Sequence, residues 1–328
     1  PPSSLPPQLR VLALTYHSPR AAATHTLTNR PSPPPWTPQA DSGVLLMEYL
    51  GGDEYVVDTV SRGGVHKCVA VWRYIKGRLN GADNVYYGMR LLHVHAGGDS
   101  VTGATRGAED KVAAPSGADF ADPDDGRNGD VSGEVIDEVE AAMVPRMVQY
   151  VFGVLDALGI ANGAVHSECK HDGATAAGRA RGAVLIESNC RLHGAEGSWR
   201  PIADACLGYS HVSALLDAYT DGAAFAALPR TPSALRAHGA QVGVRSVVAG
   251  TLARVDADAL GAIRGVASYV GECLPASLAV GQRIDKTIDI VTLVGQVNLV
   301  HADAAQLEAD LATVQAIIDR GLFEVYAE

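Results

Sequence analysis

A carboxylate, an amide and a guanidinium stand at alternate positions of the apolar segment from Val184 to Arg191, which reads V-L-I-E-S-N-C-R. Because successive side chains of a strand point to opposite faces, we expect Glu187, Asn189 and Arg191 to project from one face. Carboxylate and amide oxygens suit Mg²⁺, and a guanidinium suits a phosphate group. The pattern therefore predicts a strand with a metal- and phosphate-binding face. The alternative is a solvated edge strand without a ligand.

A second short strand is predicted just upstream, where residues 161–170 read A-N-G-A-V-H-S-E-C-K. His166 and Glu168 would share one face of that strand. The stretch between the two strands is rich in Gly and Ala and contains the turn signal H-D-G. If the two strands pair, Glu168 and Glu187 can lie side by side, and two carboxylates at that spacing need a cation between them.

A third segment has the pattern of a nucleotide-binding hinge. Residues 44–58 read V-L-L-M-E-Y-L-G-G-D-E-Y-V-V-D, which predicts an apolar strand, a Gly-Gly break and a second strand beginning at Glu54. An extended hinge would leave backbone groups of Glu48 and Leu50 free for the edge of an adenine, and the Glu54 carboxylate could accept hydrogen bonds from ribose hydroxyls. A plain hairpin would show the same pattern.

Helical spacing of apolar residues marks the longer elements. It predicts helices over residues 134–159, 202–219 and 304–320, and a shorter helix near 257–266. Strand and turn patterns occupy most of 61–89 and the rest of 243–300. Helices and strands in this order predict an α+β fold with a mostly antiparallel sheet flanked by helices.

Two stretches have the composition of irregular chain. Residues 1–43 are rich in Pro and hold no acidic residue before Asp41, which predicts a tail, a linker or a transit-like segment. Residues 97–133 are dominated by Gly, Ala, Asp and Ser, which predicts a disordered surface insertion. The globular lobe would then span residues 44–328. Because the first residue is Pro, the sequence leaves open that the chain is a fragment or a processed product.

Composition excludes some partners. The 328 residues carry a formal net charge of −11 without a dense basic run, so non-specific nucleic-acid binding is not expected. Apolar runs stay below the about 18 residues that cross a bilayer, so no membrane span is expected. The five widely spaced Cys residues predict reduced, buried thiols and a cytoplasmic location, with import into an organelle left open.

Several single residues have more than one reading. In the loop R-L-H-G-A-E-G-S-W at 191–199, His193 is a candidate to move a proton or to bind a phosphate, whereas Trp199 is expected to fill the core. His66 and Lys67 are expected to be structural or solvated. A competing zinc site would use the C-x-H pair at 169–171 and the C-x-x-H pair at 190–193. Strand alternation weighs against it, because these Cys side chains would point away from the acidic face.

The motifs together resemble one family. The segments M-E-Y-L-G-G-D-E-Y, V-H-S-E-C and V-L-I-E-S-N-C-R, followed by L-H-G, stand in the order found in the ATP-grasp superfamily. The chain resembles in particular the carboxylate–amine ligases typified by bacterial L-amino acid ligases and carnosine synthase, over residues 44–94 and 134–320. The resemblance implies an ATP-grasp large lobe, with the family's N-terminal domain and small lobe missing or degenerate.

The resemblance also implies roles for individual residues. Glu48 and Leu50 would contact adenine, and Glu54 would contact ribose. Arg191 would bind the transferred phosphoryl group or the acyl phosphate. His193, a candidate from its place in the loop and not from the resemblance, is the second predicted catalytic residue. The implied ligands of Mg²⁺, or of Mn²⁺ in its place, are Glu168, Glu187 and Asn189.

The function implied by the resemblance is that of an ATP-dependent ligase. It would join a carboxylate to an amine through an acyl phosphate, forming an amide or peptide bond, with amino acids as the expected substrates. A homodimer or a partner domain would supply the missing lobe. The alternative is a non-catalytic descendant that keeps the ATP-grasp sheet as a nucleotide-binding or scaffold module.

Overall fold

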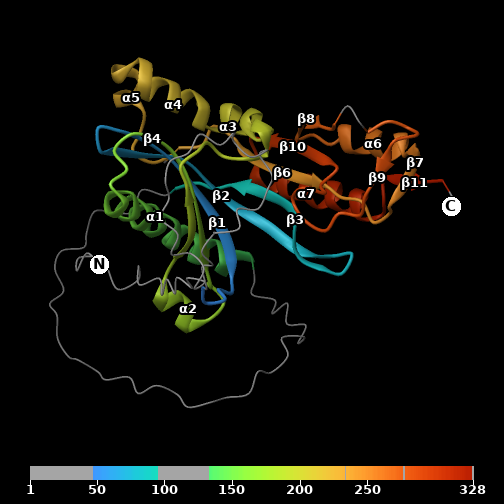
Figure 1. Cartoon of the computed structure of the whole chain (residues 1–328), viewed down its shortest axis with the longest axis horizontal. Coiled ribbons are helices and arrows are strands. Elements are labelled where there is room, and N and C mark those ends of the chain that lie inside the picture. Colours follow the sequence, from blue (N-terminus) through green and yellow to red (C-terminus); the bar gives the residue numbers. More distant parts are fainter. Residues whose placement is uncertain (1–46, 95–132, 233, 276–277, 327–328) are drawn as a thin grey trace, which may run out of the picture. The chain divides into compact units, whose positions relative to one another are not determined.

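The computed structural model describes residues 47–94, 133–232, 234–275 and 278–326, with backbone alone for residues 133–139. From residue 52 onward these residues form one unit around an eight-stranded sheet with the order β5-β4-β1-β2-β3-β6-β10-β8 (Figure 1). All neighbouring strands in it are antiparallel. Its strands are β1 (Asp53–Arg62), β2 (Val65–Leu79), β3 (Ala82–Leu91), β4 (Gly163–His171), β5 (Val184–Asn189), β6 (His238–Val244), β8 (Tyr269–Cys273) and β10 (Gly295–His301).

A smaller sheet and seven helices complete the described part of the chain. The smaller sheet has the order β11-β7-β9 and consists of β7 (Gly250–Val255), β9 (Arg283–Ile284) and β11 (Phe323–Val325). The helices are α1 (Gly133–Leu158), α2 (Ala176–Arg181), α3 (Arg200–Leu207), α4 (His211–Thr220), α5 (Gly222–Ala227), α6 (Ala257–Arg264) and α7 (Ala304–Asp319). The predicted α+β class and the predicted antiparallel sheet are confirmed.

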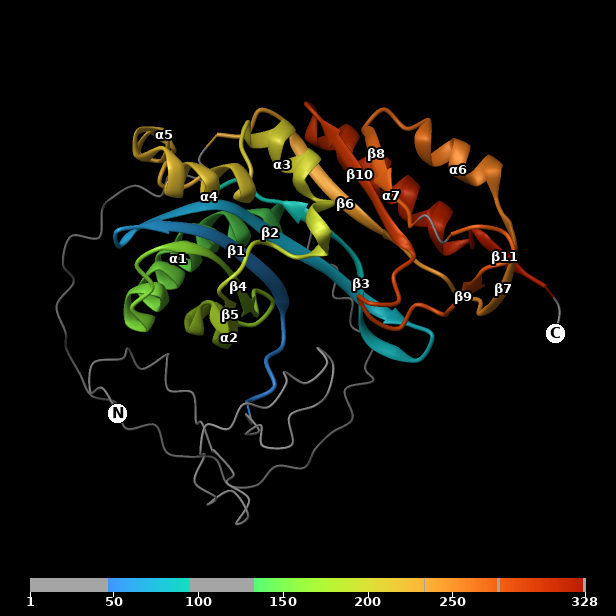
Figure 2. The same cartoon turned by 45° about the horizontal axis from the view of Figure 1, so that its top comes forward.

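The large sheet is covered on both faces by helices (Figure 2). Tyr55 and Val57 of β1 point into a core shared with α1, and β6 and β10 point alternate residues at α7. Val56 and Trp72 lie on the opposite face, in a core shared with α3, and α4 also contacts β1. We call this second face the site face, because the candidate functional residues lie on it.

Helix α1 is a core helix. Its segment Glu140–Leu158 is, in the described part of the chain, the one helical segment that is long and apolar enough to cross a membrane by length and composition, with a mean hydropathy of 1.2. Its apolar residues Met147, Val151 and Leu155 are nevertheless fully buried against the sheet. Burial of that stripe in a protein core accounts for its hydropathy.

The helix predicted over 202–219 is two helices. Gly208 ends α3 with a φ of 80°, and Ser210 begins α4 with a capping box that it forms with Ser213. A left-handed Gly followed by a Ser cap is a local stop and start signal, and here it overrides the apolar periodicity that runs through it. The predicted helices at 134–159, 257–266 and 304–320 are confirmed as α1, α6 and α7 within two residues at each end.

The hinge prediction needs a correction. Residues 47–52 form no strand, and the strand that follows begins at Asp53, one residue before the predicted start. The predicted tail at 1–43 lies outside the described residues. The predicted insertion at 97–133 also lies outside them, except for Gly133, which begins α1.

The large sheet has a narrow seam between β3 and β6. Only three residue pairs join these strands, from Gly88 with Val242 to Arg90 with Ala240. A Cβ placed on Gly88 would lie 2.1 Å from the carbonyl oxygen of Gln241, so the two strands approach closely only because this residue is Gly.

We therefore expect Gly88→Ala to destabilise the fold by about 1–3 kcal/mol, because the backbone of β6 must move to admit the methyl group. Urea denaturation measures this change. The matched control is Gly153→Ala in α1, where a Cβ meets no atom within 4 Å and Ala should be neutral or stabilising. Equal stability of Gly88→Ala and the parent protein would show that β3 and β6 can move apart at Gly88 without loss of stability.

Candidate functional site

Strand register brings the acidic residues of β1, β4 and β5 together on the site face. Glu168 is paired with Val56 on one side and with Glu187 on the other. His166 is paired in the same way with Asp58 and Asn189. Directly paired residues point to the same face of a sheet, so the predicted pairing of the two strands, with Glu168 beside Glu187, is confirmed.

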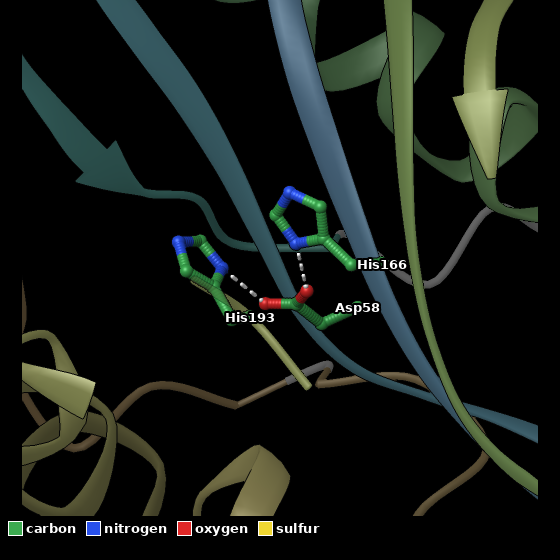
Figure 3. Close-up of side chains that lie close together, drawn as sticks. All are labelled: Asp58, His166 and His193. Atoms are coloured by element: carbon green, nitrogen blue, oxygen red, sulfur yellow. Dashed lines mark hydrogen bonds and ion pairs between the residues drawn. The ribbon is translucent and has the colours of Figure 1, made fainter. Parts of the chain in front are cut away.

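Asp58 lies at the centre of the site face and is fully buried, with 0% exposure. Its carboxylate accepts hydrogen bonds from Nδ1 of His166 at 2.9 Å and from Nδ1 of His193 at 2.8 Å (Figure 3). It also accepts one from Nε1 of Trp72 at 3.0 Å. Burial alone raises the pKa of Asp58, but the surrounding histidines outweigh this effect, since His166 and His193 both donate hydrogen bonds to the carboxylate. The pKa therefore lies well below its usual value, and Asp58 is an anion.

His166 is a cation held between two carboxylates. Its Nδ1 donates to Asp58 and its Nε2 lies 3.2 Å from a carboxylate oxygen of Glu168. Burial lowers the pKa of His166, but the hydrogen bonds to Asp58 and Glu168 outweigh this and raise it to about 9. Burial likewise raises the pKa of Glu168, and His166, Lys76 and Arg191 reverse the effect, so that it lies below its usual value.

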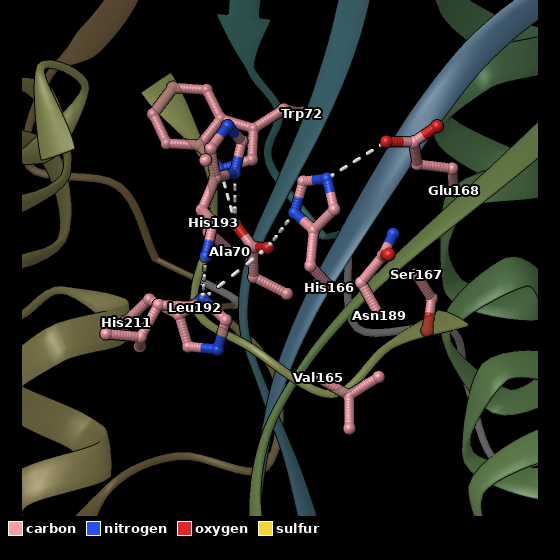
Figure 4. A network of polar contacts seen from close by, with 12 residues as sticks. Ala70, Trp72, Val165, His166, Ser167, Glu168, Asn189, Leu192, His193 and His211 are labelled. Carbon is pink, nitrogen blue, oxygen red and sulfur yellow. Dashed lines mark hydrogen bonds and ion pairs between the residues drawn. The ribbon is translucent and has the colours of Figure 1, made fainter. Parts of the chain in front are cut away.

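His211 fixes the loop that carries His193. The backbone N–H of His193 donates to Nδ1 of His211 at 3.2 Å, and Nε2 of His211 donates to the carbonyl of Thr59 at 3.0 Å (Figure 4). His211 is therefore the neutral tautomer with its proton on Nε2. Burial lowers its pKa, in agreement with this assignment.

The loop between β5 and α3 has a strained backbone. Ala195 and Glu196 have φ values of 55° and 53°, a left-handed conformation that costs free energy in residues other than Gly. Trp199 closes the loop: its indole is 1% exposed and donates to the carbonyl of Gly194 at 2.8 Å. The expectation that Trp199 fills the core is confirmed, and its packing holds the loop that begins at Arg191 against the sheet.

A cavity of about 270 Å³ opens over these residues. One side is formed by residues of β2, β3, β4 and the loop after β5, including Tyr74, Tyr86, Glu168, Arg191 and His193. The other side comes from β6, β10 and the segment before β10, and includes Gln241, Ile290, Leu293 and Gln296. The cavity combines charged groups on one side with apolar and amide groups on the other, as small-molecule sites do.

The predicted site residues are distributed as follows. Glu187 is exposed and accepts a hydrogen bond from the Asn189 amide at 2.7 Å. Glu54 is buried and pairs with Nζ of Lys76 at 2.7 Å. Glu48 is exposed and Leu50 is half-buried, both in the segment before residue 52, which belongs to a separate unit.

Asp58 and Lys76 were missed by the sequence reasoning. Asp58 stands inside the apolar run V-V-D-T-V, and a carboxylate in the middle of a buried strand is itself a signal of a polar network. Lys76 lies 4.1 Å from the centre of the Tyr86 ring. Burial lowers the pKa of Lys76, but its hydrogen bonds and charge interaction with Glu54 and Tyr86 raise it above the usual value.

Oxygen donors suited to Mg²⁺ are present on the site face. Glu168, Glu187 and Asn189 offer carboxylate and amide oxygens from neighbouring positions, the donor set that Mg²⁺ combines with waters and substrate phosphates. Arg191 and Lys76 contribute positive charge close enough to lower the pKa of Glu168, which suits a polyphosphate. The residues present therefore fit a magnesium–nucleotide group.

The four residues of the competing zinc site do not come together in the structure. Cys169 is buried in the core on the α1 side of the sheet, and Cys190 is exposed. Within the described ranges, the one group of three or more His, Cys, Asp or Glu side chains close enough to share a metal is Asp58, His166 and His193. These three already satisfy one another by hydrogen bonds, so their arrangement is that of a proton-holding network.

Comparisons with known proteins bear on the fold. Protein-family models and curated proteins give no match to the sequence. Among solved structures, an L-amino acid ligase from Bacillus licheniformis matches 86% of this chain and 53% of its own at 14% identity, with a TM-score of 0.55. A phosphoribosylglycinamide synthetase from Anaerococcus prevotii matches at 12% identity over 86% and 55%, with a TM-score of 0.48.

These likenesses concern the fold. At such low identity the match to the L-amino acid ligase shows that the described chain has an ATP-grasp fold. The chain spans about half the length of the solved structures it matches.

The raised pKa of His166 predicts how stability depends on pH. The folded pKa of about 9 exceeds the usual 6.5, so the stability from His166 is fully present below pH 6.5 and is lost as pH rises through 9. Denaturation with a chelator present should show the advantage of the parent over His166→Gln shrinking across this range, by up to about 1.4 kcal/mol per pH unit. Thr313→Ala, an exposed neutral change on α7, should follow the parent at every pH. A constant advantage would contradict the assignment of His166 as a cation.

Proposed function

We propose that this chain is the nucleotide-binding and catalytic lobe of an ATP-dependent ligase that joins a carboxylate to an amine. The observation that supports the proposal is the pairing of Glu168 with Glu187 on the site face, beside the cavity that Glu168 and Arg191 line. The oxygens suit Mg²⁺ and the guanidinium suits a phosphoryl group, and the sheet that carries them has the fold of an L-amino acid ligase.

In this proposal, phosphoryl transfer depends mainly on positioning and charge neutralisation. Glu168, Glu187 and Asn189 would hold Mg²⁺, which supplies positive charge to the nucleotide phosphates. Arg191 lines the cavity and would steady the negative charge of the acyl phosphate as it forms. Glu54 remains the proposed contact of ribose.

Amino acids are the proposed substrates. The cavity of about 270 Å³ is of a size for a small molecule, and Ile290 and Leu293 offer an apolar surface for a side chain. We also propose that a second copy or a partner domain takes part in closing the nucleotide site.

We expect Glu187→Gln to weaken the Mg²⁺-dependent binding of ADP at least about tenfold, because the exposed carboxylate leaves a metal shell without opening a cavity in the core. The melting temperature should stay nearly unchanged. Calorimetric titration of ADP with and without Mg²⁺ measures the effect, and Glu324→Gln in the smaller sheet is the matched control. Equal ADP affinity of Glu187→Gln and the parent, with Mg²⁺ present, would remove Glu187 from the metal site.

We expect phosphate release from ATP to require both a carboxylate and an amine from an amino-acid panel. Arg191→Ala should reduce this turnover by about a hundredfold or more while ATP affinity stays within a few-fold, because Arg191 acts on charge that develops during the reaction. Arg283→Ala, an exposed Arg on β9, is the control. Nucleotide binding without substrate-stimulated release would instead favour the non-catalytic module.

A further inference from the structure

His193 differs from His166 in what its second ring nitrogen meets. Both rings donate from Nδ1 to Asp58, and His166 also donates from Nε2 to Glu168. Among the described residues, Nε2 of His193 has no hydrogen-bond partner, and Figure 3 shows that this nitrogen points away from Asp58. An imidazole whose proton is held at Nδ1 carries its free lone pair at Nε2.

The ring of His193 is held firmly in this orientation. It packs against the rings of Trp72 and Trp199, with centroid distances of 5.6 and 5.1 Å, and its backbone N–H is bound by His211. Its side chain is 2% exposed and lines the cavity over the site face. A lone pair fixed at a cavity wall by its surroundings needs little reorganisation before it reacts.

We propose that Asp58 and His193 form a dyad that accepts a proton from the amine substrate, a role that rests on the ligase function proposed above. Asp58 is the positioning residue, because it holds the proton of His193 at Nδ1. His193 is the catalytic residue, because its Nε2 meets the ammonium group. His166 cannot take this role, since both of its nitrogens already donate to carboxylates.

The dyad would supply the proton acceptor that the amine substrate requires. An amino group is largely protonated at neutral pH and then has no lone pair with which to attack. Nε2 of His193 takes one proton from the ammonium. The freed nitrogen pair forms the C–N bond at the acyl carbon, and the C–O bond to phosphate breaks with its electron pair leaving on phosphate. The second amine proton leaves with the phosphate, and His193 returns its proton to solvent.

Hydroxylamine separates this step from formation of the acyl phosphate, because it is largely unprotonated at neutral pH and needs no proton acceptor. The full chain is assayed with ATP, Mg²⁺ and an amino-acid panel, once with amino acids as the amine and once with hydroxylamine. We expect His193→Gln to reduce amide formation about a hundredfold or more. Hydroxamate formation should stay within about threefold of the parent, since the earlier step is untouched.

Two further variants test whether Asp58 acts together with His193 and whether the effect is specific to this cavity. Asp58→Asn should reduce amide formation in the same selective way, and the double variant should be no worse than His193→Gln, because the two residues act as one unit. His238→Gln, the same substitution at the start of β6 and outside this cavity, should form amide and hydroxamate at the parental rates.

A measurement independent of activity tests the geometry. Nitrogen-15 NMR of the histidine rings, with the signals of His193 assigned by their loss in His193→Gln, should show a proton on Nδ1 and none on Nε2. Asp58→Asn should shift His193 toward a mixture of tautomers. If Asp58→Asn does not fold, the parent spectrum and the His193→Gln assay still decide the proposal.

The outcomes separate this inference from the ligase function. A parent protein that forms hydroxamate, together with a His193→Gln variant that forms amide at the parental rate, would overturn the dyad and leave the ligase. A proton on Nε2 of parental His193 would also overturn it. A parent protein that forms neither hydroxamate nor amide would overturn the ligase function, and the base role with it.

Discussion

The buried carboxylate of Asp58 is the constraint on which the site face depends. An unpaired charge at 0% exposure would be prohibitively costly, so the fold must bring donors to it. They come from three separate places in the chain: Trp72 on β2, His166 on β4 and His193 in the loop after β5. Satisfying one side chain therefore sets the position of a neighbouring strand on each side and of the loop that lines the cavity.

The site face is also nearly balanced in charge without a ligand. Glu54 faces Lys76, Glu168 faces His166, and Asp58 is bound by two His rings. Groups that are held by one another keep their positions before a substrate arrives, which lowers the cost of organising the site on binding. Glu187 is the exception, because it is exposed and its one hydrogen bond in the described region is to Asn189.

The parts of the structure that could be predicted from the sequence are the helices and strands whose formation depends on nearby residues. Periodicity predicted α1 and α7, and alternation predicted the two strands that place Glu168 beside Glu187. The partners of Asp58 were out of reach, because His166 and His193 lie 108 and 135 residues away and no spacing rule connects them. The break between α3 and α4 was marked locally by Gly208 and Ser210, but the apolar repeat ran across it and was given more weight.

The seam at Gly88 divides the cavity between two stretches of chain. The strands before it in the sheet order, β5, β4, β1 and β2, together with the loop after β5, hold the charged groups proposed for chemistry on the site face. The facing wall, with Ile290 and Leu293, belongs to the half that packs around α7 in its own core. In the proposed function, reactivity and substrate choice would thus belong to different parts of one sheet, on either side of the three residue pairs between β3 and β6. With such a division, mutations on the β6 and β10 side could change which substrate is bound, while the charged groups on the β1, β2, β4 and β5 side stay unchanged.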